Sequence, residues 1–266
     1  MMETNLYQLD GKIEKKIALP EAFTKRFRED LVRRAILAEQ SMRYQPQAHY
    51  ISAGMQTSAM YIGEYSTWRT GRHMGTAIRP RQKLAGGAQG DVRKIPSSTK
   101  GRRAHPHRVE KILVERINVQ EYRKALESAL SGTANQELVS KRNTPKLSTI
   151  PIVMDNKIES VAKTTDLMKI LKVVGVESDI EKSHDPKLKK GLRRSAKRRI
   201  FRKSVLIVVN ENSKVEKAGR NIPGVDVRSV KSLTVEAIAP GAIPRITVWS
   251  QSALESVQEA VKNAKL

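Results

Sequence analysis

The sequence predicts an α/β protein with a doubly wound, mostly parallel sheet, helices on both faces, and a long extended basic arm inserted near the N-terminus. Two observations predict this fold class. From residue 150 onward, short runs of aliphatic and β-branched residues alternate with segments of helical periodicity, as in parallel sheets covered by helices. Between Arg43 and Lys111, apolar periodicity is almost absent, while Gly, Arg, Lys and His are frequent. Ordinary connections are about 4–6 residues long, so this segment is expected to be a working part of the protein.

The N-terminal part predicts a hairpin followed by a helix. Residues 6–13 alternate in polarity around an Asp-Gly dipeptide, which favours a hairpin turn. Apolar residues then recur at helical spacing over residues 23–42. After the arm, apolar residues at 109, 113 and 117 open a second helical region, which continues over 121–130 and 135–141.

The C-terminal half supplies the strands and the remaining helices. The expected strands are residues 150–154, 204–209, 225–230 and 245–249. The expected helices are residues 165–174, 214–219, 233–238 and 251–264. The globular α/β domain is thus expected to consist of residues 1–42 and 106–266, and the arm of residues 43–105. Within the domain, residues 182–203 form a basic insertion. This insertion is rich in Lys and Arg and contains a single acidic residue, Asp185.

The charge balance indicates a polyanionic partner. The chain has 50 Lys and Arg residues against 27 Asp and Glu residues, a formal net charge of +23 at pH 7. RNA or DNA is the first choice of partner. Aromatic residues make up only 4% of the chain, so recognition is expected to depend on phosphates and RNA shape more than on base stacking. Neither an apolar run of about 20 residues nor an N-terminal signal pattern occurs, which predicts a cytoplasmic protein without a membrane partner.

Motifs for catalysis or cofactor binding are missing. No Gly-x-Gly-x-x-Gly or Gly-x4-Gly-Lys-Ser/Thr follows an expected strand, and the glycines at 86–90 are better explained as a flexible elbow. The chain has no cysteine, and the spacing of His105 and His107 does not suit a helical zinc site. Asp155 and Asp226 lie at or within expected strands, but neither has a visible catalytic partner. We therefore expect no catalytic residue, metal, cofactor or small-molecule substrate.

Two alternative functions remain open from the residues alone. An RNA-modifying enzyme with a Rossmann-like core would also carry a basic surface, and it would bind a cofactor at the carboxyl ends of the strands, near Asp155 or Asn210. A DNA-compacting protein would bind duplex DNA and RNA with a similar dependence on salt.

Several motifs, in order along nearly the whole chain, carry a resemblance to a known family. They are 67–72 (TWRTGR), 101–106 (GRRAHP), 133–139 (TANQELV), 220–227 (RNIPGVDV) and 233–241 (LTVEAIAPG), the last leading to 247–249 (TVW). Together they resemble the L-four family of large-subunit ribosomal proteins in its archaeal and eukaryotic form. The chain ends soon after Trp249, which favours the archaeal form because eukaryotic members carry a long C-terminal extension.

The resemblance implies a non-catalytic protein that binds large-subunit rRNA, with its globular domain on the outer surface of the subunit and its arm threading inward. In that family the tip of the arm helps to form the narrow part of the peptide exit tunnel beside a neighbouring ribosomal protein, the L-twenty-two protein. By motif, the residues expected near the tunnel are Arg69, Thr70, Gly71, Arg72 and His73.

The residues expected to bind rRNA lie in the arm and in the basic insertion. A segment so poor in apolar residues cannot offset chain entropy of about 1–2 kcal/mol per residue, so the arm is expected to be disordered until rRNA orders it. The expected rRNA-binding residues of the arm and its return are Arg69, Arg72, Arg79, Arg81, Lys83, Arg93, Lys94, Lys100, Arg102, Arg103, His105 and Arg108. Those of the insertion are Lys189, Lys190, Arg193, Arg194, Arg198 and Arg199.

Overall fold

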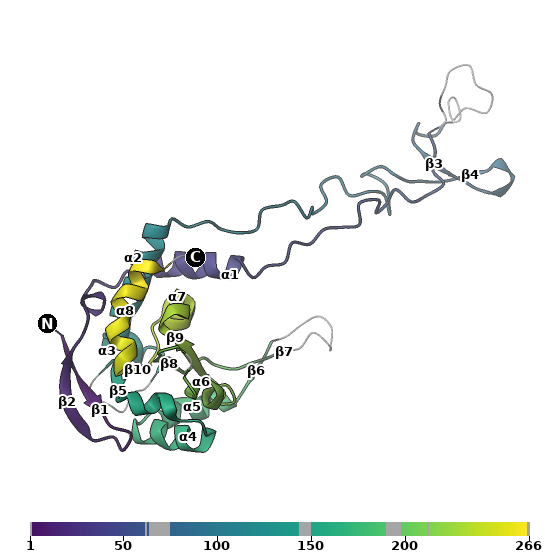
Figure 1. The fold of residues 1–266 in the computed structure, drawn as a ribbon. Coiled ribbons are helices and arrows are strands. Elements are labelled where there is room, and N and C mark those ends of the chain that lie inside the picture. Colours follow the sequence, from purple (N-terminus) through teal and green to yellow (C-terminus); the bar gives the residue numbers. More distant parts are fainter. Residues whose placement is uncertain are drawn as a thin grey trace. The chain divides into compact units, whose positions relative to one another are not determined.

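The structure, a computed structural model, describes residues 2–61, 63, 75–143, 150–189, 198–211 and 213–264. Its internal contacts divide the chain into two compact units (Figure 1). Unit 1 consists of Met1–Arg43 and Glu115–Leu266, and unit 2 of Tyr44–Val114. The second boundary therefore lies further along the chain than residue 105, where the sequence places the end of the arm.

Unit 1 contains a six-stranded, mostly parallel sheet with the strand order β2-β1-β5-β10-β8-β9. Only β1 and β2 pair in antiparallel fashion, as a hairpin, while the pairs β1–β5, β5–β10, β10–β8 and β8–β9 are parallel. The predicted α/β class with a mostly parallel sheet is confirmed. The strands are β1 (Glu3–Tyr7), β2 (Ile13–Ala18), β5 (Ile152–Met154), β8 (Val205–Val209), β9 (Val225–Ser229) and β10 (Thr247–Ser250).

Helices cover both faces of this sheet (Figure 1). Successive side chains of a strand point to opposite faces, so Leu206 and Val208 enter one apolar cluster while Val205, Ile207 and Val209 enter the other. The first cluster packs against α1 (Glu29–Ser41), α2 (Val119–Thr133), α7 (Val235–Ile238) and α8 (Gln251–Asn263), and the second against α4 (Thr164–Val173), α5 (Glu177–His184) and α6 (Val215–Gly219). A further short helix, α3 (Gln136–Ser140), follows α2.

Two helix starts differ from the sequence-based prediction. The helix expected from residue 23 begins only at Glu29, because the chain first forms a 3-10 turn at Glu21–Phe23 and then extends, with the Arg28 N–H donating to Ser128 Oγ at 2.7 Å. The helical start expected at residue 109 is wrong as well. Instead α2 begins at Val119, where the Asn118 side chain accepts a hydrogen bond from the Gln120 N–H.

Glu39 ties three helices of unit 1 together. Its buried carboxylate accepts hydrogen bonds from the Tyr122 hydroxyl (2.7 Å) and from the N–H groups of Val235 (2.7 Å) and Glu236 (2.8 Å). The carboxylate thereby satisfies donors at the start of α7 that would otherwise be buried without an acceptor. Burial raises the pKa of Glu39, although these hydrogen bonds oppose the effect.

Unit 2 contains a short antiparallel pair, β3 (Arg81–Lys83) and β4 (Gln89–Val92), and long segments without regular structure. Two of these segments contact each other. The His49 N–H donates to the His107 carbonyl at 3.3 Å. Gly54, with φ of +77°, approaches the backbone of Arg102 so closely that a Cβ there would lie 2.7 Å from the Arg102 Cα. Disorder of this unit in the absence of rRNA stays a prediction.

Candidate nucleic-acid interface

Most of the cations expected to bind rRNA in unit 2 reach solvent. Arg81, Arg93 and Lys94 are half-buried. The exposed residues are Arg79, Lys83, Lys100, Arg102, Arg103, His105 and Arg108. Exposed guanidinium and ammonium groups of this density are suited to bind a phosphate backbone.

Arg93 differs from the other cations because its guanidinium is bonded within unit 2. It donates to the Thr99 carbonyl (2.7 Å) and to Asp91 Oδ2 (3.0 Å), and its side chain is only 13% exposed. The Arg93 N–H also donates to the Pro80 carbonyl at 3.0 Å. These bonds fit a residue that shapes the loop after β4, so we expect Arg93 to contribute less to RNA affinity than its exposed neighbours.

Several expected site residues lie outside the described residues. They are Arg69, Thr70, Gly71, Arg72 and His73 of the expected tunnel-proximal stretch, and Lys190, Arg193 and Arg194 of the basic insertion.

The basic insertion begins within α5 and continues into a second hairpin. Strands β6 (Lys187–Lys189) and β7 (Arg198–Ile200) pair in antiparallel fashion, which brings Lys189 opposite Arg198 in the register. Arg199, also expected to bind rRNA, is exposed. We call the paired strands β6 and β7 the basic hairpin.

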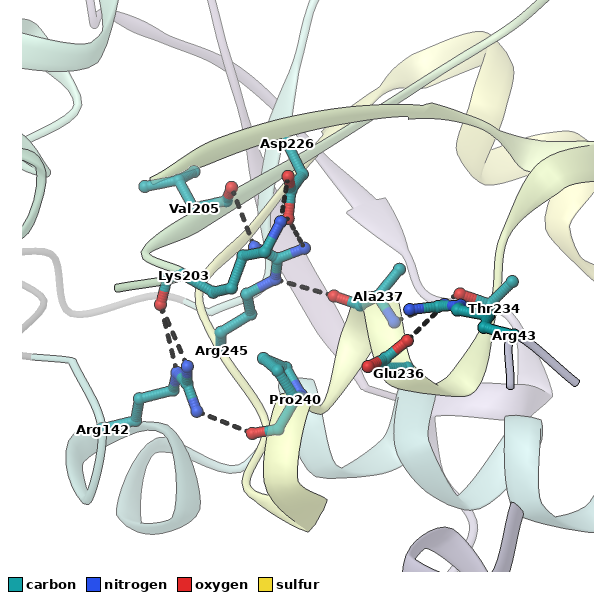
Figure 2. A network of polar contacts seen from close by, with 10 residues as sticks. All are labelled: Arg43, Arg142, Lys203, Val205, Asp226, Thr234, Glu236, Ala237, Pro240 and Arg245. Atoms are coloured by element: carbon teal, nitrogen blue, oxygen red, sulfur yellow. Dashed lines mark hydrogen bonds and ion pairs between the residues drawn. The ribbon is translucent and has the colours of Figure 1, made fainter. Parts of the chain in front are cut away.

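A network of charged groups holds the chain just after the basic hairpin (Figure 2). At its centre, Arg245 is almost completely buried, with 1% of its surface exposed. Its Nη2 lies 2.8 Å from Asp226 Oδ2, and its Nε donates to the Ala237 carbonyl at 2.7 Å. Asp226 also accepts from the Lys203 Nζ at 2.7 and 2.9 Å. Lys203, in the basic insertion, is therefore paired within the protein, although it shares the single charge of Asp226 with Arg245.

Arg142 reinforces the same segment from the other side (Figure 2). Its Nε and Nη2 both donate to the Lys203 carbonyl at 3.2 Å, and its Nη1 donates to the Pro240 carbonyl at 2.7 Å. Arg202 in turn donates to the Arg142 carbonyl. Burial, and then repulsion from Arg202, lower the pKa of Arg142. Together with Asp226, these contacts fix where the returning limb of the basic hairpin joins the sheet.

The electrostatics of this network favour ionised Asp226. Burial alone would raise its pKa, but the positive charges of Arg245 and Lys203 outweigh burial and lower it. Burial lowers the pKa of Arg245 to about 10, while Asp226 opposes the shift. Arg245 therefore remains protonated at neutral pH.

Asp226 is expected to contribute a pH-dependent part of the stability. A carboxyl group with a lowered pKa in the folded state stabilises the fold above its ordinary pKa, near 4, and loses that contribution as the pH falls through the folded-state value. Asp226→Asn should lower the free energy of unfolding by about 2 kcal/mol at pH 7, the scale of hydrogen bonds to a charged group. Urea unfolding should show the difference from the wild type shrinking toward pH 3. As a control, Asp166→Asn, which removes an exposed partner of Lys169, should change stability little at either pH. A difference for Asp226→Asn that does not depend on pH would contradict the assignment.

Glu159 occupies the position where an α/β enzyme would hold a cofactor phosphate. Near the carboxyl ends of β8 and β10, its Oε1 accepts from the Asn210 N–H (3.1 Å) and from the hydroxyls of Ser250 and Ser252 (both 2.7 Å). Burial would raise the pKa of Glu159, but the three hydrogen bonds lower it. Donors suited to an anion are thus already bonded to a carboxylate of the protein. The nearby Asp155 is paired with Lys157 at 3.4 Å.

Two further observations describe the part of the chain covered by the structure. Among those residues, no group of three or more His, Cys, Asp or Glu side chains is placed to hold a metal ion. None of the helices there combines the length and apolarity needed to cross a membrane.

The comparison with known families decides which proteins this chain is related to. The profile of the ribosomal protein L4/L1 family matches residues 17–260. The chain belongs to the ribosomal protein L4/L1 family. The resemblance inferred from motifs is therefore confirmed, and membership of a family of ribosomal structural proteins rules out the RNA-modifying enzyme.

Similar proteins of the L4/L1 family cover almost the full chain. The large ribosomal subunit protein uL4 of Archaeoglobus fulgidus is 40% identical over 261 residues, which cover 97% of this chain and 99% of the relative. The protein of the same name from Methanococcoides burtonii is 39% identical over 262 residues, covering 97% of this chain and 98% of the relative. That of Methanocaldococcus jannaschii is 35% identical, covering 97% of this chain and 99% of the relative. These three relatives are archaeal, in agreement with the archaeal form expected from the sequence.

Sequence reasoning missed the charged network of this L4/L1 family member. The sequence analysis weighs Asp226 only as a catalytic acid, whereas the structure pairs it with Arg245 and Lys203. The available signal was a charged residue at the start of one apolar strand, Arg245, and another inside a second strand, Asp226. Charges in buried strands need a partner, and the two residues have opposite signs.

Proposed function

We propose that this chain is a structural protein of the large ribosomal subunit that binds large-subunit rRNA through unit 2 and the basic hairpin. The observation that carries the proposal is the family match over residues 17–260, together with relatives named large ribosomal subunit proteins that align over nearly their full length. The net charge of +23 supports RNA as the partner. Neighbouring ribosomal proteins would complete the surroundings of the chain.

Unit 2 is proposed to be the arm that enters the rRNA. Its exposed cations, including Arg102, Arg103 and Arg108, have few acids near them in the sequence, so phosphates are the natural counterions. Asp91, one of those few acids, is already paired with Arg93. Glycines such as Gly54 let backbones approach closely, which suits a segment packed among RNA strands.

The tip of this arm is proposed to lie at residues 69–73 and to line the peptide exit tunnel beside the L-twenty-two protein. The proposal rests on the motif at 67–72, which belongs to the sequence range of unit 2. Because the chain has no cysteine, a Thr70→Cys variant carries a single thiol for a crosslinker. In stalled ribosomes this thiol should crosslink to the nascent peptide, whereas a thiol in the Lys12→Cys control should not. Equal crosslinking from both positions would contradict the tunnel assignment.

Binding to large-subunit rRNA is tested by competition between nucleic acids. Filter binding of the purified chain at 0.2 M salt should show tighter binding to large-subunit rRNA than to small-subunit rRNA or duplex DNA. The reason is that a structural ribosomal protein recognises a folded RNA shape in addition to phosphates. Equal affinities with equal salt slopes for all three would instead indicate a general polyanion binder, such as a DNA-compacting protein.

A further inference from the structure

Within unit 2, residues Tyr50 and Ile51 form the outer side of a tightly bonded turn. The Ala53 N–H donates to the Tyr50 carbonyl and the Met55 N–H to the Ser52 carbonyl, both at 2.9 Å. The Gln56 Nε2 donates to the Tyr50 hydroxyl at 3.0 Å, which restrains the tyrosine ring. We call Tyr50, Ile51 and the adjoining His49 the turn platform.

The turn platform is fixed to the returning segment of unit 2. The rings of His49 and His107 are nearly parallel, with an interplanar angle of 9° and centroids 6.0 Å apart. The Arg103 Nη1 lies 3.3 Å from the His49 Nε2. With the backbone bond from His49 to His107 and the close approach of Gly54 to Arg102, these contacts anchor the turn from several sides. The turn platform is thus organised by contacts of the protein itself.

Two adjacent apolar side chains of the turn platform are exposed. Ile51 is 98% exposed and Tyr50 is 64% exposed. A single exposed apolar residue needs no explanation, but here an aliphatic side chain, a restrained phenol ring and two parallel imidazoles lie within one small region. The neighbouring charged residues Arg102 and Arg103 are exposed cations.

We propose that the turn platform binds an unpaired nucleotide of RNA, with the base against Tyr50 and Ile51 and the phosphate beside Arg102 and Arg103. The proposal rests on the RNA-binding function proposed above and specifies the kind of RNA that unit 2 recognises. A base offers a flat apolar face next to an anion, which complements a surface of apolar and planar groups edged by guanidinium groups. Bases in a continuous duplex hide their faces by stacking, so the occupant is a loop, bulge or junction. Contact with this base would add to the phosphate contacts, which the low aromatic content of the chain predicts to dominate RNA recognition.

The test compares two RNA probes with the full chain at 0.15 M salt. Fluorescence anisotropy measures binding to a labelled 12-nucleotide oligouridylate, whose bases are unpaired, and to a 12-base-pair RNA duplex. The double variant Tyr50→Ala/Ile51→Ala should bind the oligouridylate about tenfold more weakly, the scale of one lost base stack, and the duplex with unchanged affinity. Tyr50→Phe keeps the ring and should bind both probes like the wild type. Ile13→Ala removes an Ile side chain that is 59% exposed on β2 of unit 1, and should also leave both affinities unchanged.

Different results would contradict the nucleotide site and the RNA-binding function on which it rests. A double variant that binds both probes like the wild type overturns the turn platform as a nucleotide site and leaves it as a docking surface for protein. Equal losses on the two probes overturn it as well, because they would indicate a general change in unit 2. A wild-type chain that binds neither probe nor large-subunit rRNA contradicts the proposed RNA-binding function itself.

Discussion

Replacing six exposed cations of unit 2 by glutamine is expected to weaken binding to large-subunit rRNA by about a thousandfold at 0.2 M salt. Each phosphate contact that is lost reduces the slope of log affinity against log salt by about 0.7–0.9, so six contacts account for a change of about 4–5 in the slope. Filter binding over a range of salt concentrations measures both quantities. The substituted residues are Arg79, Lys83, Lys100, Arg102, Arg103 and Arg108, all of which are exposed.

A matched set of substitutions in unit 1 separates position from net charge. It also removes six exposed cations, so both variants carry the same formal charge. If unit 2 is the main RNA-binding surface, the control variant should keep most of its affinity for rRNA. The slope of log affinity against log salt should also change little. Equal losses in the two variants would show that affinity follows overall charge, and would contradict the role of unit 2. The control residues, also changed to glutamine, are Lys12, Lys15, Lys16, Lys163, Lys169 and Lys172.

Replacing Arg245 by methionine is expected to lower the free energy of unfolding by about 3–5 kcal/mol, the usual result of removing one member of a buried ion pair. Methionine retains much of the apolar length but none of the donors. The Ala237 carbonyl loses its 2.7 Å hydrogen bond, and Asp226 loses Arg245, the buried one of its two charged partners. Urea unfolding at pH 7, followed by circular dichroism, measures the change.

Arg220→Met provides the control for this substitution. The Arg220 side chain is 75% exposed and pairs with Glu216 one helical turn away, a kind of contact that contributes about 0.3–0.5 kcal/mol. A similar, small effect of both substitutions would mean that the charged network does not stabilise the sheet. With Arg245→Met, we also expect weaker rRNA binding by the basic hairpin, because Lys203 would lose the fixed position of its acceptor, Asp226.

Much of the sheet in unit 1 was predictable because strand burial leaves a clear pattern in the sequence. The continuous apolar run that predicts a strand at 204–209 becomes β8, which is buried at every position. The helix expected from residue 251 is α8. Ser250, the last residue of β10, caps this helix by accepting a hydrogen bond from the Ala253 N–H. In these segments local preference and tertiary packing agree.

Prediction failed where apolar spacing occurred without a core to pack against. The spacing of Val109, Leu113 and Ile117 predicts a helix, but Val109 is exposed and no helix forms in this segment before Val119. Helical periodicity alone is a weak predictor of a helix, because most helical stability comes from packing of the apolar face. The first helix was predicted to begin too early, at Phe23, for a different reason. Phe23 is buried against Trp249, edge to face at 5.6 Å, through a 3-10 turn and not through a longer helix.

The candidate interface was predictable in kind but not in detail. Charge density alone indicates which segments carry surplus cations, yet it cannot distinguish an exposed cation such as Arg103 from one that is bonded internally, such as Arg93 or Lys203. That distinction depends on contacts between residues distant in the chain. The turn platform likewise depends on His49 being held beside the returning segment, which composition does not encode.

Co-sedimentation with ribosomal subunits tests the central claim most directly. The full chain, carrying a small tag, would be expressed in an archaeal host, and the extract would be separated on a sucrose gradient in high salt that strips loosely bound proteins. An integral rRNA-binding protein should remain in the fractions of the large subunit, at one copy per subunit. Recovery of the chain at the top of the gradient, or equally with both subunits, would contradict the account.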